Sequence, residues 1–111
     1  DLIKAPNGVL VLDDSKLLIV DWAGDLLEGD LQSQDIKKLG EGFEGADGLA
    51  IKQDTIYISS WIKGTIYSFK NGKTKVIADG FEAAADIALV HDNKFLVVPD
   101  MKAGTVTFIG I

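Results

Sequence analysis

Three polar residues stand at equivalent places in this sequence and could together hold a cation. Asn7, Asp47 and Asp86 each open a run of apolar residues, and they are separated by 40 and 39 positions. Side-chain oxygens with acidic character suit Ca²⁺ or Mg²⁺, and Zn²⁺ also accepts carboxylates. The trio is therefore a candidate divalent-cation site. The alternative interpretation is structural, because Asn and Asp favour tight turns and cap backbone amides.

Two tryptophans form a second candidate site. Trp22 and Trp61 each follow a run of β-branched and other apolar residues, shortly before a glycine. They could form an aromatic floor that binds a sugar, or they could pack between neighbouring sheets as large apolar side chains. Met101 is their nearest counterpart in the third copy of this pattern, and we expect it to fill space in the core.

Nucleophilic catalysis has little support in the sequence. The only histidine, His91, stands in a polar turn at 91–94, and no Gly-x-Ser-x-Gly motif is present. Cysteine is absent, which excludes a disulfide framework, a thiolate metal site and a cysteine nucleophile. We therefore expect His91 to be a turn residue.

The candidate residues belong to a repeat of about 40 residues. The turn glycines Gly24, Gly64 and Gly104 are 40 positions apart, and the runs between them are rich in strand-forming residues. Such a unit holds four strands of about five residues with short turns, which is the size of one propeller blade. The sequence therefore predicts an all-β fold, a β-propeller with three four-stranded blades.

The predicted blades cover residues 6–44, 45–83 and 84–111. The third blade ends after its third strand, and residues 1–5 are expected to form the outer strand of a closing blade. Three blades cannot close a ring, since propellers have about four to eight. We therefore expect half of a six-bladed ring, completed either by a second copy in a head-to-tail homodimer or by the rest of a longer propeller.

Local signals give the expected turns and strands. Pro6-Asn7-Gly8 is expected to be a turn before a strand at 9–12, and Asn71-Gly72 a two-residue hairpin. The leucines of residues 24–42 could be spaced as in a helix. The glycines within this stretch favour a third and a fourth strand instead.

The composition narrows the classes of partner. The chain is 47% hydrophobic with a net charge of −6, which is typical of a soluble globular protein. No apolar run approaches the ~20 residues that cross a bilayer, so we expect no membrane partner. All 11 basic residues are lysines, and the net charge has the wrong sign for a phosphate backbone. Nucleic acid is therefore not an expected partner, and the cellular compartment is not indicated.

Residues 6–21 resemble the "PNG…D…LYV.D" repeat of the gluconolactonase and senescence-marker-protein (regucalcin) family. Residues 46–51 resemble its next repeat, which begins "PDG". The resemblance implies a six-bladed propeller that hydrolyses sugar lactones with one divalent cation at its channel mouth. It implies that Asn7 and Asp47 are metal ligands and that Asp47 is the catalytic base. Asp86 matches no ligand of the family, and the family's early-blade Glu has no counterpart here.

Propellers of the NHL and low-density-lipoprotein-receptor kinds share much of this pattern and need not be enzymes. Fold-level similarity does not fix function. We therefore expect a propeller scaffold or binding module without catalysis of its own. The alternative is a divalent-metal-dependent sugar-lactone hydrolase.

Overall fold

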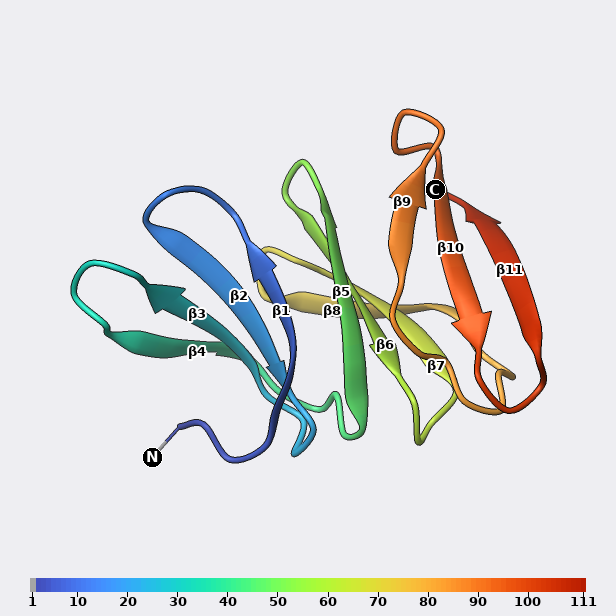
Figure 1. Ribbon diagram of the computed structural model, residues 1–111, viewed down its shortest axis with the longest axis horizontal. Helices are drawn as coiled ribbons and strands as arrows, with labels where there is room; N and C mark the ends of the chain where they lie inside the picture. Colours follow the sequence, from blue (N-terminus) through green and yellow to red (C-terminus); the bar gives the residue numbers. More distant parts are fainter. Residues whose placement is uncertain (1) are drawn as a thin grey trace.

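The structure, a computed structural model, describes residues 2–111, which form three antiparallel sheets side by side (Figure 1). These residues make eleven strands and no helix, so the expectation of an all-β fold is confirmed. Within residues 2–111 there is accordingly no helix of the length and apolarity needed to cross a bilayer.

Each sheet is a meander in which every strand pairs with its neighbour in the sequence. The order is β1-β2-β3-β4 in the first sheet, β5-β6-β7-β8 in the second and β9-β10-β11 in the third. The strands are β1 (Pro6–Val11), β2 (Lys16–Asp21), β3 (Leu26–Asp30), β4 (Ile36–Gly40), β5 (Ala46–Lys52), β6 (Thr55–Ser60), β7 (Thr65–Lys70), β8 (Lys73–Ala78), β9 (Ala88–Val90), β10 (Phe95–Asp100) and β11 (Thr105–Gly110).

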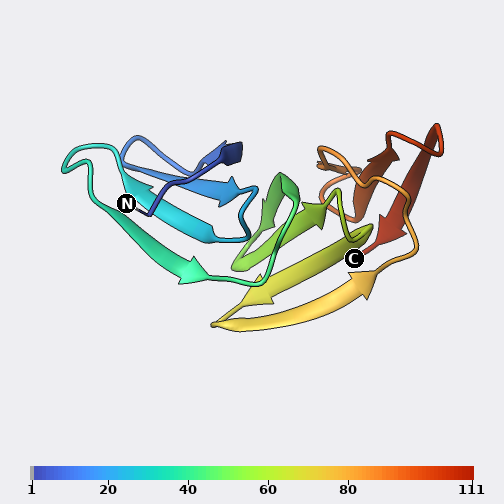
Figure 2. The same ribbon diagram turned by 90° about the horizontal axis from the view of Figure 1, so that it is seen from below.

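The sheets follow one another along an arc with their faces in contact, as propeller blades do (Figure 2). The first strand of each sheet is the inner one, and β1, β5 and β9 contact each other in that order. The third sheet has three strands, and residues 2–5 lie outside all strands. An outer strand formed by residues 1–5 stays a prediction, and Asp1 lies outside the described residues.

Two apolar layers hold the three sheets together. The first layer, between the first and second sheets, contains Leu18, Val20, Leu26, Phe43, Ala46, Leu49, Ile56, Ile58, Tyr67 and Phe69. The second, between the second and third sheets, contains Ala50, Tyr57, Ile66, Ala84, Ile87, Leu96 and Val98. The middle sheet is thus apolar on both faces, which explains its nearly continuous apolar strands.

The prediction of a turn at Pro6-Asn7-Gly8 is wrong. β1 already begins at Pro6, and the corresponding Gly48 lies within β5. A β-bulge interrupts the pairing of both strands at this place, and bulges favour the small residues that turns also use. The prediction of strands within residues 24–42 is confirmed by β3 and β4.

Two turns differ in backbone strain. Asn71 and Gly72 connect β7 to β8 with φ of 52° and 74°, which confirms the two-residue hairpin. In the turn between β9 and β10, the three non-glycine residues His91, Asp92 and Asn93 also have positive φ, from 54° to 62°. Left-handed backbone costs an L-residue about 1–2 kcal/mol, so this second turn is strained.

Replacing Asp92 by Gly should therefore stabilise the protein by about 1 kcal/mol, because Gly adopts positive φ without a steric penalty. Asp14 provides a matched control, since it is an exposed aspartate in the corresponding β1–β2 turn and has no positive φ. Asp14→Gly should leave stability unchanged or lower it. Urea unfolding of the three proteins measures both effects, and equal changes in the two variants would contradict the expected strain.

Candidate functional site

Asn7, Asp47 and Asp86 lie at one edge of the molecule, where the inner strands begin. We call this the entry edge, and it is formed by the residues around the backbone pairs Pro6–Asp21, Ala46–Ser60 and Ala84–Asp100. It lies along the lower side of Figure 1, where β2, β6 and β10 also end. Asn7 and Asp47 thus stand on the inner strands β1 and β5, and Asp86 stands two residues before β9, all at one edge.

The inner strands approach each other so closely that only glycine fits after Asn7 and Asp47. A Cβ atom on Gly8 would lie 2.5 Å from the carbonyl oxygen of Asp47, and one on Gly48 would lie 2.8 Å from Cα of Asp86. Neither glycine has a positive φ. The Asn-Gly and Asp-Gly dipeptides therefore serve close backbone approach between sheets, which brings the side chains before them together.

The electrostatics of the trio centre on Asp47. Burial raises the pKa of its carboxyl, and the nearby charge of Asp86 raises it further. The Asn7 amide donates a hydrogen bond to the carbonyl of Ala46 at 3.2 Å. No three His, Cys, Asp or Glu side chains within residues 2–111 are arranged to hold a metal. Because Ca²⁺ takes six to eight oxygens, ligation by this trio stays a prediction that needs further ligands.

Ser59, which sequence reasoning missed, fixes the backbone beside both aspartates. Its side chain is fully buried. Its Oγ accepts a hydrogen bond from the Gly48 N–H at 2.9 Å and donates one to the Ala85 carbonyl at 2.6 Å. The only sequence signal is a polar residue at a place where the other two repeats have Val20 and Pro99.

The carboxylates at the ends of β2 and β10 accept hydrogen bonds from backbone N–H groups at the entry edge. Asp21 accepts backbone hydrogen bonds from Lys4, Ala5 and Ala23, and Asp100 accepts them from Glu82, Ala83, Lys102 and Ala103. Burial opposes ionisation of Asp21, but these donors outweigh it and lower its pKa. The N–H of Ala103 contributes most to the lowered pKa of Asp100.

Ser60 takes the same place in the middle sheet. Its Oγ donates to the Glu44 carbonyl at 2.7 Å and accepts from the Lys63 N–H at 3.1 Å. The end of the second strand therefore carries a side chain that binds local backbone in all three sheets. A polar residue repeated at this position was the available sequence signal.

Trp22 directly follows Asp21 and Trp61 directly follows Ser60, and the two tryptophans lie side by side. Their ring centroids are 6.1 Å apart, with the planes at 45°, and Nζ of Lys102 lies 4.6 Å from the centroid of the Trp61 ring. The structure thus joins the two tryptophans from adjacent sheets, whereas sugar binding by them stays a prediction. Met101 is 71% exposed, so the expectation that it fills the core is wrong.

His91 lies away from these residues. It is in the turn between β9 and β10, at the edge opposite the entry edge, and its ring packs against Phe95 with centroids 6.0 Å apart. The expectation of a turn residue is confirmed.

Comparisons with known proteins show the fold. No family model and no curated protein matches the chain. The chain is similar to a solved structure described as "Crystal structure of Nidogen/Laminin Complex", with a TM-score of 0.82 and 15% sequence identity. The match covers 98% of this chain and 44% of that one. It supports a propeller-type fold, whereas these comparisons do not support the gluconolactonase family.

Ser59→Ala should destabilise the protein by about 1–3 kcal/mol, because it leaves the buried Gly48 N–H and Ala85 carbonyl without their partner. Ser68→Ala is the matched control, since Ser68 is a partly buried serine on the same face of the neighbouring strand β7. Urea unfolding checks both variants. A Ser59→Ala protein as stable as the Ser68→Ala protein would contradict the role of the hydroxyl.

Proposed function

We propose that the chain is a non-catalytic binding module that works as half of a six-bladed propeller, closed by a second copy head to tail. One observation carries this proposal. The two uncovered sheet faces at the ends of the arc correspond to the two sides of the interface that the chain already forms twice between its own sheets.

Exposure at equivalent positions supports the correspondence. On the third strand of each sheet, Leu26 and Ile66 are fully buried against the following sheet, whereas the equivalent Val106 is 61% exposed. On the first strand, Leu49 is 7% exposed against the preceding sheet, whereas the equivalent Val9 is 59% exposed. The same positions are buried wherever a neighbouring sheet is present.

The two uncovered faces are apolar. On the N-terminal face Val9 and Val11 are exposed and Leu17 and Ile36 are half-buried, whereas Ile19 and Leu27 are already buried. The C-terminal face consists of Ala88, Val90, Phe95, Val97, Pro99, Val106 and Phe108, none of which is buried. Contiguous apolar surface of this kind marks an interaction site. The N-terminal face corresponds to the side of a sheet that packs on the preceding sheet, and the C-terminal face to the side that packs on the following sheet. An N-terminal face is therefore suited to a C-terminal face and not to another N-terminal face.

A second copy is the occupant that this pairing favours. Two copies supply six blades, which is within the range of about four to eight found in propellers. Head-to-tail interfaces form a ring when the rotation between subunits closes. A half-turn between two copies would form the interblade contact twice more and leave neither face uncovered.

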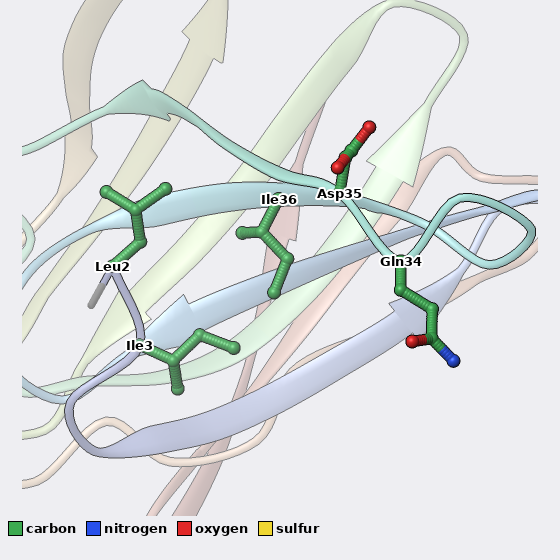
Figure 3. A pocket seen from close by; sticks show the side chains of 5 residues that line it. All are labelled: Leu2, Ile3, Gln34, Asp35 and Ile36. Carbon is green, nitrogen blue, oxygen red and sulfur yellow. The ribbon is translucent and has the colours of Figure 1, made fainter.

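The segment before β1 lies against the N-terminal face, which would be an interface in the proposed ring. Leu2, Ile3 and Ile36 surround a hollow of about 650 Å³ at the N-terminal face (Figure 3). Leu2 is 42% exposed, so the segment covers this face only in part. In the proposed ring, Leu2 and Ile3 would leave this hollow and extend along the free edge of β11 of the partner copy, while Lys4 and Ala5 keep their bonds to Asp21.

Light scattering should give the parent chain a mass near twice 11.9 kDa. Val11→Lys and Phe108→Lys each place a charge in both closing interfaces, and each should weaken association at least tenfold, about 1.4 kcal/mol. Mixing the two variants should restore association at one of the two interfaces, because the intact C-terminal face of the Val11→Lys copy then meets the intact N-terminal face of the Phe108→Lys copy.

Val76→Lys is the matched control for these variants. Val76 is 58% exposed, close to the 55% of Phe108, but it lies on β8 of the middle sheet, outside both faces. This variant should keep the mass of the parent. A monomeric parent, a variant that still dimerises alone, or an open polymer would each overturn the closed head-to-tail ring.

The setting of Asp47 favours a second candidate, the sugar-lactone hydrolase implied by the sequence resemblance. A general base works best when its pKa lies near the working pH. Both burial and Asp86 raise the pKa of Asp47 from its ordinary low value. In this candidate Asp47 accepts a proton from the attacking water at the entry edge. The divalent cation would need ligands beyond Asn7, Asp47 and Asp86.

Asp47→Asn should then abolish hydrolysis of glucono-δ-lactone, measured with calcium or zinc present. The variant should also be more stable than the parent at pH 7. The folded-state pKa lies above the unfolded value of about 3.9, so ionisation of Asp47 costs stability as the pH rises through the folded-state pKa. Near pH 3 the two proteins should be equally stable. A parent without lactonase activity, or an active variant, excludes this candidate.

A further inference from the structure

We propose that the Trp22–Trp61 pair is the binding site for a basic segment of a partner protein, which places an Arg or Lys side chain on the face of the Trp61 ring. This inference rests on the binding role proposed above and names its site. It does not depend on ring closure, because all the residues of the site belong to one chain.

The Trp61 ring already carries a cation within the molecule. Nζ of Lys102 lies 4.6 Å from the ring centroid, well within the ≈ 6 Å over which a cation is attracted to an aromatic face. Lys102 belongs to the β10–β11 turn of the neighbouring sheet, and its side chain is exposed. It can therefore leave the ring, and a partner's cation can take its place at little cost.

The two rings stand on fixed backbone. The Trp22 N–H donates to the Ala5 carbonyl and the Trp61 N–H donates to the Gly45 carbonyl, each at 2.8 Å. Asp21 and Ser60 immediately precede the tryptophans and bind the backbone of the same turns. Because this backbone is fixed and the two rings already lie against each other, the pair loses little freedom when a ligand binds, which favours affinity.

The charge around the pair suits a basic partner. The chain has a net charge of −6. Asp47 and Asp86 lie on the same entry edge, and neither forms an ion pair within residues 2–111. Lys63, in the adjoining β6–β7 turn, is paired with Glu44 at 2.8 Å. The edge therefore attracts cations and repels acidic partners.

Two exposed apolar side chains are next in sequence to residues of this site. Ile62 is 58% exposed and Met101 is 71% exposed, each directly adjacent in sequence to Trp61 or Lys102. Arg and Lys bury their aliphatic stems on such surface while the charged end remains free. Aromatic residues and Met are also enriched where proteins bind proteins.

The test titrates a hexa-arginine peptide with blocked ends and follows tryptophan emission. Trp22 and Trp61 are the only tryptophans of the chain, so all the emission reports on the site. Binding should be saturable. Trp61→Leu should weaken it about three- to fivefold, as expected for one cation–π contact at an exposed site, with Trp22 as the remaining reporter.

Lys102→Ala should strengthen binding about twofold or more relative to Lys73→Ala. The two variants change the net charge equally, but Lys73 lies in the distant β7–β8 hairpin. If these two variants bind the peptide equally well, or if Trp61→Leu binds it as well as the parent does, binding depends on net charge alone and the proposal is overturned. So would equal binding of hexa-glutamate, or a response to maltose without a response to the peptide. Mass measurements on the same samples keep this outcome separate from that of ring closure.

Discussion

Every sheet of this chain carries apolar side chains on both faces, and the rest of the structure depends on that constraint. A two-faced sheet is covered only when a neighbour lies on each side. The middle sheet meets this condition, with Ile58 buried towards one neighbour and Ile66 towards the other. The outer two sheets meet it fully on one side only. On the other side, the first sheet has Leu27 buried but Val9 exposed, and the third sheet has Val106 and Phe108 exposed.

Hydrogen bonds of polar side chains fix the sheets relative to each other at the entry edge. The inner strands nearly touch beside Gly8 and Gly48, and Ser59 ties the second contact with a buried hydroxyl. Asp21 and Asp100 fix the turns just outside these strands. The aspartates and tryptophans at this edge therefore stand on backbone whose hydrogen bonds are already formed.

The strands could be predicted because their signals are local. The 40-residue spacing of turn glycines and the β-branched runs can be recognised without knowing the neighbouring sheet. In the leucine-rich stretch, the glycines favoured strands over a helix, and β3 confirms this prediction. The close approach at Gly8 could not be predicted, because it depends on the backbone of Asp47 in another sheet. An Asn-Gly dipeptide has the same appearance in a turn and in a bulge. The role of Ser59 is hidden for the same reason, since its partners Gly48 and Ala85 lie on β5 and in the segment before β9.

The meander order of the strands has a consequence for how the molecule is made. Because each strand pairs with its sequence neighbour, each sheet can form from successive hairpins, and contacts of short sequence separation form fastest. The three sheets should therefore fold and pack on each other before the two end faces associate with another molecule. In the proposed ring, the two copies would join in a slower, second-order step, so dilution should separate them without unfolding the sheets of either copy.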